Sequence, residues 1–309
     1  MGARSGKCLM CADDDTTGPP PPYYIVPAQD PLKQDRIQRC DASKDFDFGA
    51  KGSQVFNQGK WYILRLAKNR ATKEKVAVKQ FPKSNLIVNQ LRNEAVVYLQ
   101  VDHANICRLL HVYESAKAVE LVMELCGPDL QVRLSEQKVY PEGKAAEMVL
   151  QMMHAVDYLH TNNIVHRNLK LEHWLSGTSP SDDQLKLSGF KYARKLTKRD
   201  EIMQEDVGTL AYCCPELFSC KYTCKCDIWS LGVICYMLVV GKPPFYFSDN
   251  DVKTKYAIIH SDFPKDGRWK SLSGSTQQFV VQLLQKNAAQ RPDSTRALQE
   301  VKKWKSSTA

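Results

Sequence analysis

His166-Arg-Asn-Leu-Lys-Leu-Glu-His173 lies near the middle of this 309-residue chain, and six further segments stand in a fixed order around it. Three precede it: a Lys that ends a strand-like run, a Glu on a helix-like run, and an apolar run. Each segment alone has little meaning, since a strand Lys is usually an exposed side chain. Their shared order makes a chance match improbable. The six are Val76-Ala-Val-Lys79, Glu94, Leu121-Val-Met-Glu-Leu-Cys126, Gly208-Thr-Leu-Ala-Tyr-Cys-Cys-Pro-Glu216, Asp227-Ile-Trp-Ser-Leu-Gly232 and Arg291.

The hydrophobic pattern changes from strand-like to helix-like along the chain. Alternating or β-branched runs predict strands over 59–67, 74–81 and 119–125. Apolar residues at helical spacing predict helices over 86–101, 141–159, 227–240 and 275–284. The chain therefore divides into a strand-rich first part and a mainly helical second part, which is an α+β fold class.

Composition narrows the class of protein. The hydrophobic content of 43% and charged content of 25% exclude disorder and coiled coil. The net charge of +9 comes from scattered Lys and Arg, so we expect a solvated surface and no nucleic-acid partner. The longest apolar stretch, 228–240, is shorter than the ~20 residues of a membrane span and predicts a buried core helix. The 11 cysteines lack a disulfide-scaffold spacing and no secretory signal is present, which predicts a cytoplasmic location.

The ordered segments resemble the protein kinase family, over about 46–304. Among kinases they are most similar to the calcium/calmodulin-dependent and calcium-dependent serine/threonine group. The resemblance implies a two-lobed fold, with an N-lobe over 46–124 and a C-lobe over 125–304. It leaves 1–45 as an N-terminal tail with a proline-rich spacer and 305–309 as a short C-terminal tail.

The resemblance also implies a nucleotide site. Lys79 matches the strand Lys that holds the α- and β-phosphates of ATP, and Glu94 matches its helix partner. The backbone of residues 124–126, the hinge between the lobes, would bond the adenine edge. The implied nucleotide-binding residues are Gly59, Lys79, Glu94, Met123, Glu124 and Cys126.

Five residues match structural positions of the family. Asp227 would anchor the catalytic loop, which contains His166 and Arg167. Glu216 and Arg291 would form an ion pair in the large lobe. These positions support the fold rather than the chemistry.

Three positions of the catalytic machinery depart from the family pattern. Asn168 replaces the catalytic Asp, and an amide cannot accept a proton from a substrate hydroxyl at neutral pH. His173 replaces the metal-binding Asn, and Gly189 replaces the carboxylate that binds Mg²⁺. Lys170 and Thr209, which frame the substrate hydroxyl in serine/threonine kinases, are retained.

The glycine-rich phosphate loop is altered as well. Asn57, Gly59 and Tyr62 stand at its three glycine positions, so only the middle glycine remains. Glycines are needed there because the loop backbone must approach the phosphates closely. A Tyr at the third position would crowd or cap the phosphate site.

These departures predict a pseudokinase that acts as a scaffold or allosteric regulator of other proteins, such as an active kinase or its substrates. We expect ATP binding to be weak and little dependent on Mg²⁺, and we expect no protein-bound metal. An atypical serine/threonine kinase that transfers the γ-phosphate to protein hydroxyls is the alternative.

No EF-hand pattern follows Arg291. Five cysteines close in sequence are expected to be core or loop residues rather than zinc ligands because none are spaced C-x₂-C: Cys213, Cys214, Cys220, Cys224 and Cys226.

The N-terminus resembles the dual-acylation signal of calcium-dependent kinases. Gly2 would carry myristate, and Cys8 or Cys11 would carry palmitate, which together would tether the protein peripherally to the inner face of a membrane. The signal is imperfect because Gly6 stands where Ser or Thr is expected. An unmodified tail is therefore the open alternative.

Overall fold

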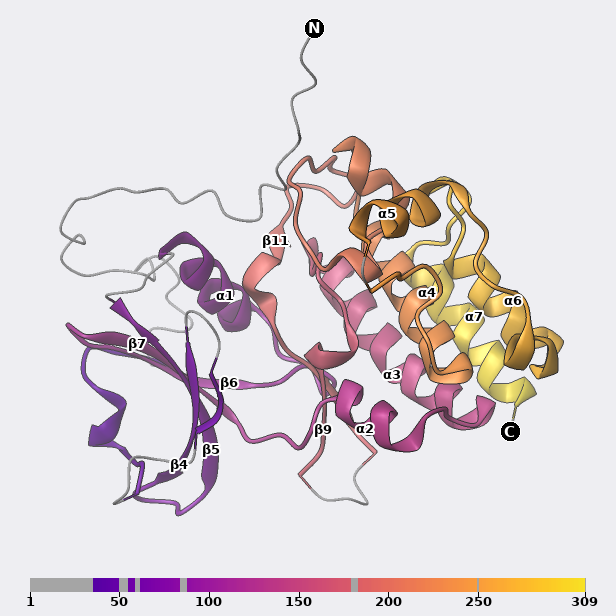
Figure 1. Ribbon diagram of the computed structural model, residues 1–309. Coiled ribbons are helices and arrows are strands. Elements are labelled where there is room, and N and C mark those ends of the chain that lie inside the picture. The colour runs from indigo at the N-terminus through magenta and orange to yellow at the C-terminus, as the bar shows by residue number, and fades with distance from the viewer. Residues whose placement is uncertain are drawn as a thin grey trace, which may run out of the picture.

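A twisted sheet builds the first lobe of the computed structural model, and helices build the second (Figure 1). The structure describes residues 36–49, 55–58, 62–83, 88–178, 183–248 and 250–308. Within them the sheet has the order β1-β6-β7-β5-β4-β2, and β3 pairs with β4. Its strands are β1 Ile37–Gln38, β2 Phe46–Asp47, β3 Val55–Gln58, β4 Ile63–Asn69, β5 Lys75–Pro82, β6 Leu109–Glu114 and β7 Ala118–Glu124. The predicted α+β class and the two-lobed fold are confirmed.

Alternation along β5 places the first functional side chain. Val76 and Val78 are buried on one face of the strand, in a small core with Phe46 and Val122. Because successive side chains of a strand point to opposite faces, Lys79 lies on the other face. Strand β5 lies between β4 and β7 in the sheet, so the backbone of Lys79 is paired on both sides.

The sheet extends into the segment that the sequence analysis assigns to the tail. Ile37 of β1 pairs in parallel with Val112 of β6. Ala42 is completely buried, and its amide donates to the Glu120 carboxylate at 2.8 Å. The folded domain therefore begins before residue 46, and the predicted boundary at 45 is too late. The last helix, α7 Ser294–Ser307, also runs past the predicted boundary at 304.

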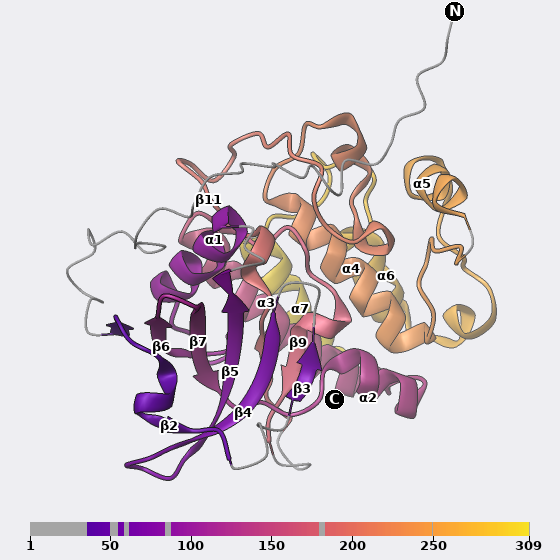
Figure 2. The same cartoon turned by 60° about the vertical axis from the view of Figure 1, so that its left-hand side comes forward.

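The second lobe is organised around α4, Lys225–Val240. Every residue from Cys226 to Val239 is buried, so the predicted core helix is confirmed. Helices α3, α6 and α7 pack against α4, as Figures 1 and 2 show. The other helices of this lobe are α2 Leu130–Gln137, α3 Glu142–Thr161, α5 Asp251–His260 and α6 Gly274–Leu283, and its short strands are β8 Ile164–Val165, β9 Trp174–Ser176, β10 Leu185–Leu187 and β11 Arg194–Lys195.

Helix α1, Val88–Gln100, connects the two lobes. It lies between the sheet and the segment that carries β11 (Figure 1). The Asn93 amide group donates to the carbonyl oxygen of Lys191 at 3.3 Å, which holds the helix to the second lobe. In the described part of the chain, no helix is both long and apolar enough to cross a bilayer.

Candidate active site

An ion pair joins the sheet to α1. Nζ of Lys79 lies 2.7 Å from Oε1 of Glu94, and the Glu94 side chain is only 3% exposed. A carboxylate buried to this degree needs a cation partner, because an unpaired buried charge is costly. The ion pair therefore fixes the direction of the Lys79 ammonium.

Tyr62 covers the same ammonium. The ring centroid of Tyr62 lies 4.4 Å from Nζ of Lys79 and 5.9 Å from the Phe81 ring centroid. A cation over an aromatic face gains electrostatic stabilisation from the ring. Tyr62 therefore occupies space above Lys79, and its capping of the phosphate site stays a prediction. Gly59 lies outside the described residues.

The hinge follows β7. Met123 is buried and pairs with Leu109 of β6, and the Glu124 amide donates to the Arg108 carbonyl at 3.0 Å. Cys126 is half-buried. The hinge backbone is therefore held by β6.

Asp227 anchors the catalytic loop from the start of α4. It accepts hydrogen bonds from the backbone amides of His166 and Arg167 at 2.9 and 2.8 Å, and from Nε2 of His160 at 2.9 Å. Burial alone would raise the pKa of Asp227, but the His160 hydrogen bond and the amide donors hold that pKa below its usual value. The loop therefore closes around a fixed carboxylate, as the sequence predicts.

Asn168 lies in this loop with its side chain engaged. Its Oδ1 accepts a hydrogen bond from the Thr209 hydroxyl at 2.9 Å. Lys170 lies nearby in sequence and pairs with Glu172 at 3.2 Å. The amide of Asn168 can orient a hydroxyl group, but it has no basic atom to take its proton.

His173 and Gly189 lie in direct contact. Nδ1 of His173 donates to the Asn168 carbonyl at 2.8 Å, which fixes the ring. A Cβ atom built on Gly189 would lie 2.6 Å from Cδ2 of that ring, and Gly189 has a positive φ of 83°. Burial, His166 and Lys170 together lower the pKa of His173 well below 6.5, so the imidazole is neutral. The ring therefore fills the space in which any side chain at position 189 would begin.

An aromatic column runs from α1 to the catalytic loop. The Phe190 ring packs edge-on against the rings of Tyr98 and His166, with centroids 4.8 and 5.0 Å from its own. The Tyr98 hydroxyl also accepts a hydrogen bond from the Gly189 amide at 3.2 Å. This column ties α1, and hence Glu94, to the second lobe.

Arg167 is held by an acidic side chain from the segment after β11. Its guanidinium lies 3.2 Å from Oε2 of Glu205, and Arg194 binds the other oxygen of the same carboxylate at 2.7 Å. Arg194 also pairs with Glu201. Carboxylates of the chain itself thus order this segment.

Glu216 and Arg291 form the predicted ion pair. The two guanidinium nitrogens lie 2.7 and 3.1 Å from the two carboxylate oxygens, and Arg291 is 1% exposed. Arg291 also donates to the backbone carbonyls of Gln285 and Lys225. The pair is bidentate and its arginine is buried, which is the geometry expected of a structural rather than a catalytic contact.

These side chains occupy the order and places that the family resemblance implies, and the family model described as "Protein kinase domain" matches residues 55–302. The chain belongs to the protein kinase family. The kinase fold explains why Lys79 meets Glu94, and why Asp227 meets the loop at 166–173, although the partners are apart in sequence.

Two curated relatives are calcium-dependent protein kinases. The chain is 31% identical over 245 residues to calcium-dependent protein kinase 12 of Arabidopsis thaliana, covering 77% of this chain and 50% of the relative. It is 32% identical over 228 residues to calcium-dependent protein kinase 5 of Plasmodium berghei (strain Anka), covering 73% of this chain and 40% of the relative. The chain thus spans half or less of the length of these relatives.

The residues of the site suit the nucleotide of Mg·ATP but not its metal ion. Lys79 and the hinge offer a cation and a backbone edge, which suit a nucleotide. Mg²⁺ prefers six oxygen ligands, whereas positions 173 and 189 offer a neutral imidazole and no side chain. The contact between His173 and Gly189 leaves no room for a carboxylate there, so this donor set does not suit Mg²⁺.

The structure does not describe some of the predicted residues, and the sequence motifs did not indicate some residues that position the site. Gly2, Cys8 and Cys11 fall outside the described residues. The search missed Tyr98, His160 and Glu205, which position α1, Asp227 and Arg167. His160 could have been found, because it directly follows the helix predicted over 141–159, just before the catalytic loop. Tyr98 and Glu205 could not have been found, because the sequence around them does not differ from that around an ordinary core or surface residue.

Proposed function

We propose that this protein is a pseudokinase that serves as a scaffold or allosteric regulator in protein phosphorylation, holding other proteins without efficient phosphate transfer of its own. The observation that carries the proposal is the packing of the His173 ring against Gly189. At this place the kinase reaction requires a metal ion, because metal and cationic groups neutralise the charge of the transferred phosphate.

The size of the expected losses supports the proposal. Loss of a general base slows proton transfer by about 10²–10⁴-fold, and Asn168 has no basic atom. The metal ligands are altered at two positions at once, so the electrostatic contribution falls as well. Lys79 and Lys170 remain to balance part of the phosphate charge, which favours nucleotide binding over turnover.

A scaffold needs a stable shape more than it needs chemistry. The Lys79–Glu94 ion pair holds α1 to the sheet, and the aromatic column holds α1 to the second lobe. Glu205 orders the segment after β11 through Arg167 and Arg194, with no added phosphate. These contacts favour a single fixed arrangement of the lobes, which a partner protein could recognise.

An active serine/threonine kinase is the second candidate. The intact ion pair at Lys79 and the contact between Thr209 and Asn168 favour it, as does the similarity to two proteins named calcium-dependent protein kinases. A direct assay separates the two candidates.

We expect the purified full chain to transfer phosphate from ATP to itself and to myelin basic protein no faster than its Lys79→Met variant. The reason is that Asn168 cannot take a proton and the site lacks the oxygen ligands of Mg²⁺. Incorporation of radioactive γ-phosphate measures the rate. Turnover of the wild-type chain well above that of Lys79→Met would establish the active kinase instead.

We expect ATP to raise the melting temperature equally with and without Mg²⁺, and Lys79→Ala to abolish the shift. Nucleotide at about 100 times its dissociation constant would stabilise the fold by about 2.7 kcal/mol, which a thermal melt detects. Lys75→Ala is the matched control, because Lys75 is an exposed lysine of the same strand. A shift that requires Mg²⁺ would contradict the loss of the metal site.

A further inference from the structure

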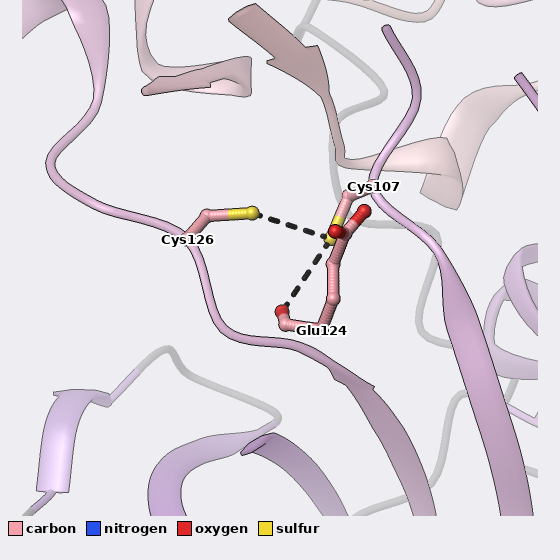
Figure 3. Close-up of side chains that lie close together, drawn as sticks. All are labelled: Cys107, Glu124 and Cys126. Carbon is pink, nitrogen blue, oxygen red and sulfur yellow. Dashed lines mark hydrogen bonds between the residues drawn. The ribbon is translucent and has the colours of Figure 1, made fainter. Parts of the chain in front are cut away.

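Two cysteines and a glutamate come together at the hinge, on the side where β6 begins and β7 ends (Figure 3). The sulfur atoms of Cys107 and Cys126 lie 3.9 Å apart. One carboxylate oxygen of Glu124 and both sulfurs all lie within 4.8 Å of one another. Cys107 is buried, whereas Glu124 and Cys126 are half-buried and can be reached from solvent.

Hydrogen bonds and an ion pair fix two of these residues, Cys107 and Glu124. The Cys107 amide donates to the Leu187 carbonyl at 2.9 Å, and the Glu124 amide donates to the Arg108 carbonyl at 3.0 Å. The Arg108 amide returns a hydrogen bond to Oε1 of Glu124 at 2.7 Å, and Lys186 lies 3.0 Å from the same oxygen. The cluster is therefore organised before any ligand arrives.

The spacing of the sulfur atoms suits a tetrahedral metal ion. Two thiolates bound to Zn²⁺ at ~2.3 Å in tetrahedral geometry lie about 3.8 Å apart, and the observed separation is 3.9 Å. A disulfide would need a separation of ~2.05 Å, so the two thiols are not bonded to each other. Two sulfurs and one carboxylate oxygen are a donor set for Zn²⁺ or a softer ion, not for Mg²⁺ or Ca²⁺.

We propose that Cys107, Cys126 and Glu124 form a binding site for a thiophilic divalent cation, Zn²⁺ foremost, at the hinge of this protein. Two thiolate sulfurs and one carboxylate oxygen are the protein ligands, and water completes the tetrahedron. Binding releases the two thiol protons to solvent. The two thiolates and the carboxylate carry one negative charge more than the ion, and the Lys186 ammonium beside Glu124 offsets it.

Thiols must lose their protons to bind the ion, so affinity for the ion rises with pH. The hydrogen bond with the Cys126 thiol and burial raise the pKa of Cys107 well above its ordinary value. The site goes beyond the proposed pseudokinase function and does not depend on it, since it uses hinge side chains rather than the phosphate-binding residues.

Metal titration of the reduced, chelator-treated full chain tests the site. The Cys8→Ser/Cys11→Ser background removes a competing pair with C-x₂-C spacing. We expect one Co²⁺ per chain, with thiolate charge-transfer bands and the visible spectrum of a tetrahedral ion. Zn²⁺ should displace Co²⁺ and abolish these bands. Competition with a chromophoric chelator gives the Zn²⁺ affinity.

Substitutions locate the ion. Cys126→Ser is expected to remove the charge-transfer bands and to weaken Zn²⁺ binding at least about 100-fold, and Glu124→Gln to weaken it about 10-fold. Cys40→Ser, at a half-buried cysteine of the first lobe, should change neither. Unchanged Co²⁺ spectra in Cys126→Ser, or no stoichiometric binding by the background chain, would overturn the proposal.

Protection from alkylation provides a measurement that needs no variant. Cys126 is half-buried and should react with iodoacetamide in the metal-free chain. Zn²⁺ should slow that reaction, because a metal-bound thiolate is a weaker nucleophile, while exposed Cys220 should react equally with and without Zn²⁺. Peptide mass spectrometry measures both rates. Equal labelling of Cys126 in the two conditions would refute the site.

Discussion

Gly189→Asp is expected to lower the free energy of unfolding by about 3 kcal/mol and to leave phosphate transfer at background. The new Cβ would lie 2.6 Å from Cδ2 of His173, a ring that is fixed by its hydrogen bond to the Asn168 carbonyl. Overpacking of a core costs about 1–3 kcal/mol, and a side chain at positive φ adds about 1 kcal/mol. Urea denaturation of the purified variant measures the loss.

The paired substitution separates this contact from a general effect of position 189. His173→Asn removes the ring, so His173→Asn/Gly189→Asp should recover most of the lost stability. The double-mutant cycle should give a coupling of about 1–3 kcal/mol. A coupling near zero, or a Gly189→Asp chain as stable as the wild type, would contradict the steric argument.

The same pair of substitutions bears on catalysis. Adding Asn168→Asp would restore the side chains that the kinase reaction uses. We still expect slow transfer, because the Tyr62 ring lies 4.4 Å from Nζ of Lys79 and occupies the space above it. The Lys79–Glu94 pair already joins α1 to the sheet, so the remaining obstacle is local.

The core elements of the fold could be predicted because their signals are local. The strand predicted over 74–81 is β5 Lys75–Pro82, and the helix predicted over 227–240 is α4 Lys225–Val240. Helix α7 was missed because only three of its fourteen residues, Ala297, Val301 and Trp304, are buried apolar residues. Strand β1 was missed because it has two residues and is stabilised by its pairing with β6.

The site could be predicted only residue by residue. Motif order gave the identities of Lys79, Asp227 and Arg291, and the structure places each beside its expected partner. Contacts between positions far apart in sequence could not be predicted. His173 meets Gly189 because β9 and β10, which follow and precede them, pair as a hairpin.

The hinge cysteines illustrate the same limit. Eighteen residues lie between Cys107 and Cys126, a spacing that matches no metal-binding motif. Antiparallel pairing of β6 with β7 brings them together, because the register sets Leu109 opposite Met123. A cluster made by strand register has no signature in a single sequence.

Glu216→Ala is expected to lower the free energy of unfolding by about 3–5 kcal/mol and the melting temperature by about 10 °C. The substitution leaves the Arg291 guanidinium with a net charge inside the second lobe, where it is only 1% exposed. Its remaining hydrogen bonds to the carbonyls of Gln285 and Lys225 involve neutral groups and do not neutralise it. Differential scanning calorimetry measures the change.

An exposed ion pair provides the control for this prediction. Lys265 and Asp262 lie 3.6 Å apart with side chains 51% and 85% exposed, so Asp262→Ala should change the stability by less than about 1 kcal/mol. The difference between the two variants measures what burial adds to the cost of breaking a charge pair. If Glu216→Ala is as mild as Asp262→Ala, water must reach Arg291, and the pair does not hold the second lobe together. A large loss in Glu216→Ala alone would show that the ion pair keeps α4 and the segment before it in register with the C-terminal helices, whether or not the protein transfers phosphate.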